Sequence, residues 1–265
     1  MKIGVFDSGF GGLTVLRELL LAIPRADYLY LGDTARLPYG SKSAATVARY
    51  AVSSVEFLVQ HGAEYVVIAC NTASALAMDH IRAAVRAEVL GVIVPGARAA
   101  AAMTRAKNVS VIGTAATVSS HAYRRELQKL GISAIEKACP LLVPLVEEGW
   151  VDHPVTEQVA RIYLQELAAE QRSQNGSADV LVLGCTHYPL LKPLLRRVLP
   201  ETMQLVDSAQ ATAHDAAKAL DVQRGASGNP AVQFFATDFV EKFRLLGSRF
   251  LQREIDRVTL IALPE

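Results

Sequence analysis

Two short segments carry the residues best able to do chemistry. They are IACNTASA, at residues 68 to 75, and LGCTHYPL, at residues 183 to 190. In each, a cysteine stands at the end of an apolar run, and a threonine follows it by one or two positions. A thiol has a reference pKa near ~8.5, so its surroundings can make both thiol and thiolate available near neutral pH. Two sulfurs on opposite walls of one site can take a proton from one face of a carbon atom and deliver a proton to the other face. The pair Cys70 and Cys185 therefore predicts a racemase.

Each of these two sulfurs has a neighbour that could adjust its acidity. His187 lies two positions after Cys185, and Asp7 follows the first apolar run of the chain. Both have plainer interpretations, since Asp7 could cap the helix that follows it and His187 could be a buried structural histidine. The remaining cysteine, Cys139 in EKACPLL, is interpreted as a small buried apolar residue.

Strand-like and helical segments alternate along almost the whole chain. We expect strands at residues 2–6, 27–32, 64–69, 91–94, 108–113, 132–136, 179–184, 203–207, 232–237 and 257–263. Several of these runs are too continuously apolar to have a face in water, which is typical of parallel sheets covered by helices on both faces. Ten strands are many for one open sheet. The pattern therefore predicts an α/β fold with two parallel sheets.

The polar clusters of the chain stand where these strands end. Asp7 and Ser8 follow the first strand, GDTARLPYGSKS follows the second, and Thr114 follows NVSVIG. Ligands of parallel α/β sheets bind beyond the carboxyl ends of the strands. NVSVIGTAAT, at residues 108 to 117, resembles a second start like KIGVFDSGFGG at residues 2 to 12. We therefore expect two pseudo-symmetric domains, the first ending near Pro95, with the active site in the cleft between them.

Composition and charge exclude several classes of protein. The chain has 27 Lys plus Arg against 26 Asp plus Glu, a net charge of +1, so it lacks the electrostatic footprint of a protein that binds nucleic acid or an anionic membrane. No apolar run approaches the roughly 20 residues of a membrane span. Three cysteines, an odd number, argue against a disulfide framework and favour a reducing, cytoplasmic location.

We expect neither a metal nor a cofactor. Cys185 and His187 have no further ligands at a recognisable zinc spacing. Pyridoxal phosphate would need a Schiff-base lysine and a phosphate cradle, and Lys42 is the only lysine in a strand-end motif.

Taken together, the motifs resemble the bacterial, cofactor-independent glutamate racemases. The resemblance covers essentially the whole chain through FDSGFGGLTVLREL, YLGDTARLPYGSKS, VIACNTASA, VPGA, VIGTAATVSSHAY, LVLGCTHYPLL and LVDSA. It implies that Cys70 serves D-glutamate and Cys185 serves L-glutamate, with help from Asp7, His187 and Glu147. The last of these, in PLVEEGW, would orient His187, although it also fits a solvated helix end. The resemblance further implies that the amino acid is held by Asp7, Ser8, Tyr39, Gly40, Asn71, Thr72, Thr114, Thr117, Thr186 and His187.

The same resemblance implies a cellular role and an assembly. The product would be D-glutamate for peptidoglycan, and the protein would be a homodimer. The C-terminal segment would return to the first domain, so that residues 1–95 plus 207–265 form the domain of Asp7 and Cys70, and residues 96–206 form the domain of Cys185 and His187.

Three other functions stay open from the residues alone. An aspartate racemase would use the same two thiols, with the length of the pocket setting its substrate. A cysteine hydrolase would use a dyad of Cys185 and His187 with an oxyanion hole, but it would leave Cys70 unexplained. A two-domain amino-acid-binding protein would close on its ligand without turnover.

In a racemase we expect the α-carboxylate to be held by amides and hydroxyls of Asn71, Thr72 and Thr186 rather than by Arg36 or Arg98.

Overall fold

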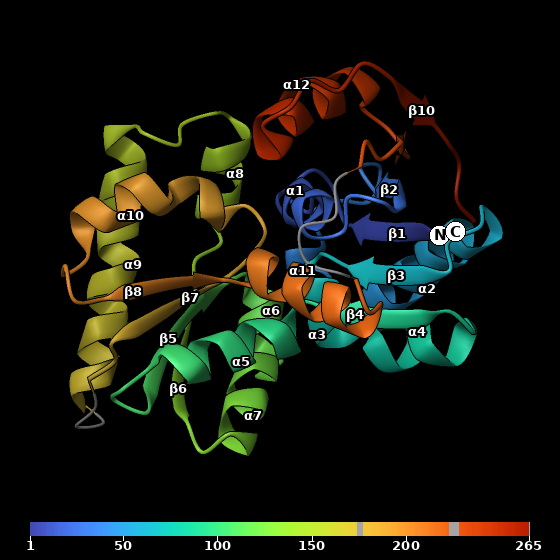
Figure 1. The fold of residues 1–265 in the computed structure, drawn as a ribbon. Helices are drawn as coiled ribbons and strands as arrows, with labels where there is room; N and C mark the ends of the chain where they lie inside the picture. Colours follow the sequence, from blue (N-terminus) through green and yellow to red (C-terminus); the bar gives the residue numbers. More distant parts are fainter. Residues whose placement is uncertain (174–176, 223–227, 265) are drawn as a thin grey trace.

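The computed structural model of the chain describes residues 1–173, 177–222 and 228–264. Its strands form two sheets in which every pairing is parallel (Figure 1). One sheet has the order β10-β9-β2-β1-β3-β4 and the other the order β6-β5-β7-β8. The strands are β1 (Lys2–Asp7), β2 (Asp27–Gly32), β3 (Tyr65–Ile68), β4 (Glu88–Gly91), β5 (Asn108–Gly113), β6 (Ser133–Ala138), β7 (Val180–Gly184), β8 (Gln204–Asp207), β9 (Val232–Ala236) and β10 (Val258–Leu260).

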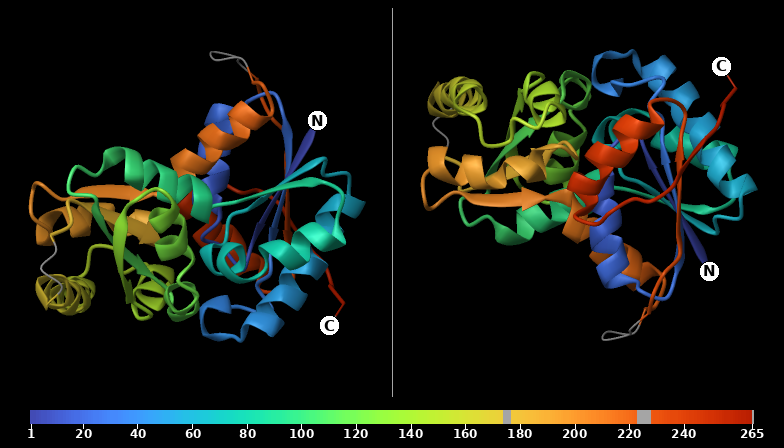
Figure 2. Two further views of the ribbon diagram at one scale, coloured as in Figure 1. Left: turned by 90° about the horizontal axis from the view of Figure 1, so that it is seen from below. Right: turned by 90° about the horizontal axis from the view of Figure 1, so that it is seen from above.

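Helices cover both faces of the sheets (Figure 2). This arrangement confirms the predicted α/β class with two parallel sheets. The α-helices are α1 (Leu13–Ala22), α2 (Ala44–Gln60), α3 (Asn71–Leu76), α4 (Met78–Ala84), α5 (Ile93–Met103), α6 (Ala115–Ser119), α7 (Ala122–Lys129), α8 (Leu142–Glu147), α9 (Pro154–Ser173), α10 (Lys192–Val198), α11 (Ser208–Ala219) and α12 (Val240–Leu251). Two short 3-10 helices, η1 (Tyr39–Ser41) and η2 (Tyr188–Leu191), follow strand ends.

The two sheets repeat one topology. Four consecutive strands of the first sheet lie in the order β2-β1-β3-β4, and the four of the second lie in the matching order β6-β5-β7-β8. In each half the chain places its second strand on one side of the first strand and then crosses to place the third strand on the other side. Such a reversal separates the loops that follow the first and third strands, and it leaves a crevice at their carboxyl ends. The expected pseudo-symmetry is therefore present in the strand order.

Burial along the strands explains the apolar runs of the sequence. Every residue of β3 and of β7 is buried, because helices cover both faces of a parallel sheet. One apolar cluster is continuous between the halves, since it includes Val5 and Val67 from the first sheet and Leu181 and Leu183 from the second. This shared core holds the two rims of strand ends in a defined relation.

One predicted strand was wrong. Residues 91–94 were expected as a strand, but β4 ends at Gly91 and α5 begins at Ile93. The β-branched pair Ile93 and Val94 imitates a strand, whereas Pro95 suits the first turn of a helix because no hydrogen bond from its nitrogen is needed there. The true strand, Glu88–Gly91, is partly exposed and so has no continuous apolar run.

The C-terminal segment packs against the first sheet. Strand β9 pairs with β2, and β10 pairs with β9. The hydroxyl of Thr237, just after β9, donates to Asp33 Oδ1, just after β2, over 2.9 Å. Helix α11 packs on α1 of the first half and on α5. Within the described residues, no helix combines the length and the apolar character that a membrane crossing requires.

Candidate active site

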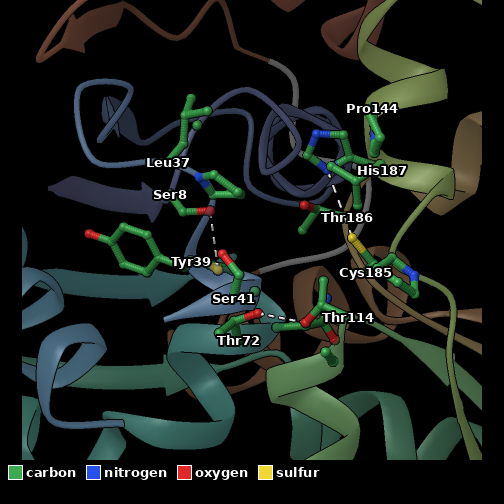
Figure 3. A pocket seen from close by; sticks show the side chains of 18 of the residues that line it. Ser8, Leu37, Tyr39, Ser41, Thr72, Thr114, Pro144, Cys185, Thr186 and His187 are labelled. Atoms are coloured by element: carbon green, nitrogen blue, oxygen red, sulfur yellow. Dashed lines mark hydrogen bonds between the residues drawn. The ribbon is translucent and has the colours of Figure 1, made fainter. Parts of the chain in front are cut away.

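The carboxyl ends of the first and third strands of both sheets meet around one pocket. Asp7 ends β1 and Gly113 ends β5, while Cys70 and Cys185 follow β3 and β7 by two residues and one residue, respectively. Since β3 and β7 are the third strands of the repeat, the two cysteines occupy corresponding places in the two halves. Both line the same pocket, which has a volume of about 170 Å³ (Figure 3). This is below the roughly 300–1,000 Å³ of sites for drug-sized ligands, so it suits a small metabolite.

The structure brings most of the predicted site residues to this pocket. Its lining includes eleven of the thirteen: Ser8, Tyr39, Gly40, Cys70, Asn71, Thr72, Thr114, Glu147, Cys185, Thr186 and His187. Asp7 and Thr117 do not line the pocket but lie behind residues that do. Sequence reasoning missed Gly9, Leu37, Pro38, Ser41, Ala115, Pro140, Val143 and Pro144.

The missed residues give one side of the pocket an apolar wall. Val143 and Pro144 stand four and three positions before Glu147 on α8, which is one helical turn, so the three share a face. That spacing is the only signal in the sequence that could have found them. Ser41 belongs to the loop GDTARLPYGSKS and could have been included with Tyr39 and Gly40.

Cys70 is a buried thiol held by neutral partners. It is the N-cap residue of α3, where its Sγ accepts a hydrogen bond from the amide of Ala73 over 3.4 Å and donates one to Ser8 Oγ over 3.5 Å. Burial raises the pKa of the Cys70 thiol to about 12, and the charge of Asp7 adds to this rise, while the two hydrogen bonds oppose it. In the ligand-free protein Cys70 is therefore a protonated thiol at neutral pH.

Cys185 has a different set of neighbours. Its Sγ lies 3.8 Å from Nδ1 of His187, and Nε2 of the same ring lies 3.1 Å from Oε1 of Glu147. Lys242, at the start of α12, places its Nζ 3.8 Å from the other carboxylate oxygen of Glu147. Phe250 of the same helix presents an edge to the ring of His187, with centroids 5.2 Å apart. A row of alternating acidic and basic groups thus ends at the sulfur of Cys185.

The charged neighbours in this row determine whether the imidazole of His187 is protonated. Burial alone would lower the pKa of His187, but its contacts with Cys185 and Glu147 outweigh burial and raise the pKa to about 10. Burial would raise the pKa of Glu147, yet the contacts with His187 and Lys242 outweigh it and lower that pKa. At neutral pH the row therefore contains an imidazolium next to a carboxylate.

Asp7 is a buried carboxyl group behind the Cys70 wall. Its Oδ2 accepts a hydrogen bond from the amide of Gly9 over 2.9 Å, whereas its Oδ1 has no hydrogen-bond partner among the residues that the structure describes. Burial raises the pKa of Asp7, and the charge of His187 and the amides of Gly9 and Gly12 oppose the rise. A buried acceptor without a partner costs free energy, so Oδ1 lacks the stabilisation that Oδ2 receives from Gly9.

Three threonine hydroxyls, two of which line the pocket, join the two halves. Thr72 follows β3, and its Oγ1 lies 3.0 Å from Thr114 Oγ1 and 3.3 Å from Thr117 Oγ1, both after β5. Thr114 also caps α6, because its hydroxyl accepts a hydrogen bond from the amide of Thr117. Figure 3 shows the side chains of Thr72 and Thr114 next to each other, joined by a dashed line. Each hydroxyl can rotate to donate to a ligand oxygen.

Glycines allow the two halves to approach this closely. A Cβ on Gly11 would lie 2.6 Å from Nδ1 of His187, and a Cβ on Gly40 would lie 2.8 Å from Cβ of Thr114. Both distances are below ordinary van der Waals contact. The loop SGFGG and the η1 turn of the first half thus reach the second half only because these residues have no side chain.

Neither arginine nor lysine is the means by which this pocket would hold an acid. The described lining contains neither arginine nor lysine. Arg36 pairs with Asp33 over 2.8 Å and lies over the ring of Tyr50, and Arg98 pairs with Asp215 over 3.4 Å on the surface. In the part of the chain that the structure describes, no group of three or more His, Cys, Asp and Glu side chains is arranged to hold a metal ion.

Comparison with known proteins places this geometry in a family. Residues 3–216 match the family described as Asp/Glu/Hydantoin racemase. A glutamate racemase from Koribacter versatilis is 57% identical, over 97% of this chain and 95% of that protein. The crystal structure of a glutamate racemase isoform from Bacillus anthracis is similar with a TM-score of 0.90, at 36% identity over 99% of this chain and 97% of that one. The glutamate racemase of Francisella tularensis, solved in complex with D-glutamate, is similar with a TM-score of 0.88, at 34% identity over 98% of this chain and 97% of that one. This chain therefore belongs to the Asp/Glu/hydantoin racemase family and, within it, groups with the glutamate racemases.

Proposed function

We propose that this protein interconverts L-glutamate and D-glutamate by moving the α-proton between two thiols, without a cofactor. The observation that carries the proposal is the placement of Cys70 and Cys185 at corresponding strand ends of two repeated sheets, lining one small pocket. An α-carbon between them would have one sulfur on each face. A hydrolase needs only the contact of Cys185 with His187, and it gives no reason for a second buried thiol on the same pocket.

The neighbours of the two sulfurs supply the order of proton transfer. With L-glutamate bound, a Cys185 thiolate paired with the His187 imidazolium removes the α-proton, and the Cys70 thiol donates its own proton to the opposite face. Cys185 then carries a proton and Cys70 is a thiolate, which is the state that begins the reverse reaction with D-glutamate. Glu147 holds the imidazole from its far side over 3.1 Å, and a preorganised charge of this kind avoids reorganisation during the reaction.

The polar groups of the pocket would hold the substrate. We assign the α-carboxylate to the amides and hydroxyls of Asn71, Thr72 and Thr186, because negative charge grows on that group as the α-proton leaves. Ser8, Tyr39, Gly40, Thr114 and Thr117 would hold or support the rest of the amino acid, and Asp7 Oδ1 would favour its ammonium group. The absence of arginine and lysine from the described lining supports recognition of both carboxylates by amides and hydroxyls.

The cellular assignments follow from this activity. D-glutamate made here would supply peptidoglycan synthesis, which would place the protein in cell-wall biogenesis, in control of cell shape and in the cytoplasm. We also propose a homodimer, and two domains formed by residues 1–95 plus 207–265 and by residues 96–206. The pairing of β9 and β10 with the first sheet supports the return of the C-terminal segment.

Circular dichroism of the purified protein with each enantiomer of glutamate and of aspartate tests the proposal. We expect both glutamate enantiomers to reach the same racemic end point, with aspartate turned over at least about a hundredfold more slowly, because a pocket built for one chain length leaves polar groups unpaired with another. Turnover of aspartate at the rate of glutamate would assign the other racemase specificity. No racemisation of either acid would reject the proposal.

A further inference from the structure

The side chain of Asn71 accepts a hydrogen bond from a residue in the other half of the molecule. Asn71 is the first residue of α3, directly after Cys70, and it is only 3% exposed while lining the pocket. Its Oδ1 accepts a hydrogen bond from the hydroxyl of Tyr123 over 2.8 Å. Its Nδ2 is buried and has no hydrogen-bond partner among the described residues.

Tyr123 is built to be a fixed donor in this contact. It lies on α7 and is fully buried. Burial raises the pKa of Tyr123, and the nearby Ser208 side chain partly opposes the rise, so the phenol keeps its proton at neutral pH. A Cβ on Gly96 would lie 3.1 Å from the Tyr123 hydroxyl, so the glycine of the VPGA motif leaves room for that group. The phenolic proton of Tyr123 is the one donated to Asn71 Oδ1.

The planar side-chain amide of Asn71 can be placed in two orientations that exchange Oδ1 and Nδ2. They differ in which of these two atoms faces the pocket. When Tyr123 holds Oδ1, the two protons of Nδ2 are left for a ligand. In the reversed orientation Oδ1 would face a carboxylate, and acceptor would meet acceptor. A buried donor without a partner is costly, so its retention beside Cys70 indicates a ligand atom that accepts from it.

We propose that Tyr123 is a positioning residue for the racemisation, which acts by locking the side-chain amide of Asn71 with Nδ2 directed at the substrate α-carboxylate. The proposal rests on the proposed function. It assigns to α7, an element of the second half, the orientation of a binding group carried by the first half. The packing of the two halves against each other therefore completes the carboxylate site as well as the pair of thiols.

A double-mutant cycle separates this role from general support of the fold. Tyr123→Phe removes only the hydroxyl, and we expect kcat/KM for glutamate to fall about tenfold, as for loss of one hydrogen bond that acts in the transition state. Most of the fall should be in kcat, because the carboxylate gains charge as the proton leaves. In the Asn71→Ala background the same change should alter kcat/KM by less than about twofold, since the group on which Tyr123 acts is gone.

Tyr28→Phe is the matched control. Tyr28 is also fully buried, and its hydroxyl donates to the backbone oxygens of Leu19 and Ile23, remote from the pocket. This variant should lose thermal stability but keep kcat/KM within about twofold of wild type. A second test uses Asn71→Asp, in which Tyr123 would hold one carboxylate oxygen and leave the other facing the substrate, so its loss should exceed that of Asn71→Ala.

The outcomes distinguish the inference from the function on which it rests. Suppose that wild type racemises glutamate. The positioning role is then wrong, and the proposed function stands, if the fold-losses in kcat/KM of Tyr123→Phe and Asn71→Ala multiply in the double variant. The same conclusion follows if Asn71→Asp loses no more kcat/KM than Asn71→Ala. If wild type binds glutamate without racemising it, the same cycle is measured on the dissociation constant by calorimetry. Independent effects on binding would then overturn the inference as well. If Tyr123→Phe does not fold, the comparison of Asn71→Asp with Asn71→Ala alone decides.

Discussion

Glu147→Gln tests whether charge on the row behind Cys185 contributes to the reaction. The change keeps the shape of the side chain and removes one negative charge 3.1 Å from Nε2 of His187. The two side chains are 15% and 10% exposed, so solvent screens the pair only weakly. Lys242 and His187 are the cations that face the lost charge.

The size of the effect follows from the contact. A hydrogen bond to a charged partner contributes about 1.5–3 kcal/mol, and one pKa unit corresponds to about 1.4 kcal/mol. The pKa of His187, about 10 in the intact protein, should therefore fall by about one to two units. If the same free energy stabilises the imidazolium in the transition state, kcat/KM should fall roughly 10- to 150-fold. The loss should be greatest between about pH 8 and about pH 10, where only the wild-type imidazole stays protonated.

The measurement is a profile of kcat/KM against pH together with titration of the His187 ring by NMR. Glu148→Gln is the matched control, because Glu148 is the next residue, is exposed and loses the same charge. We expect it to stay within about twofold of wild type. Equal losses in the two variants, or an unchanged His187 titration in Glu147→Gln, would show that the row does not tune Cys185.

Three further changes should have measurable results. In deuterated water, Cys70→Ala should introduce deuterium at Cα of L-glutamate without inverting it, and Cys185→Ser should do the same to D-glutamate if serine is too weak a base. Deuterium in both enantiomers with either variant would contradict the two-thiol mechanism. Because the pKa of His187 is raised from 6.5 to about 10, its contribution to the free energy of unfolding is complete below pH 6.5 and is lost as pH rises through about 10. Chemical denaturation should detect this fall, on the order of a few kcal/mol, in wild type and not in His187→Gln. Gly11→Ala would place a Cβ 2.6 Å from Nδ1 of His187, so kcat/KM should fall more than about tenfold, and unchanged kinetics would show that the SGFGG loop can move away without cost.

Local patterns in the sequence were enough to find the strand ends and hence much of the site. Residues such as Cys70 and Thr114 stand directly after apolar runs, and parallel sheets bring such positions to one edge. Both also cap the helices that follow them, which gives their polar atoms a role that is visible locally. The strand at 91–94 was misplaced because Ile93 and Val94 have strand propensity while the edge strand β4 has only a partial apolar pattern.

Contacts between distant elements left no such pattern. Glu147 is 40 residues from His187 in sequence, and nothing in PLVEEGW distinguishes it from the exposed Glu148. Lys242 reaches Glu147 only because α12 returns to the first half and packs on α1. Tyr123 reaches Asn71 across the two halves for the same reason of tertiary packing. To find residues of this kind, one must know the relative positions of whole helices and strands, and the periodicity of the sequence does not give these positions.

The two halves repeat one strand order, yet they surround their sulfurs differently. Cys70 faces the hydroxyl of Ser8 and a backbone amide, with Asp7 behind it, whereas Cys185 faces an imidazolium supported by Glu147. This asymmetry cannot favour one enantiomer at equilibrium, because L-glutamate and D-glutamate have equal free energies and kcat/KM must be the same in both directions. In the proposed mechanism it would influence how protons are distributed between the sulfurs before substrate binds. An enzyme with two equally acidic thiols would hold both as thiols or both as thiolates over much of the pH range, and neither state can take one proton and give another. In the proposed two-thiol mechanism, unequal surroundings on a repeated frame would keep one acid and one base available together.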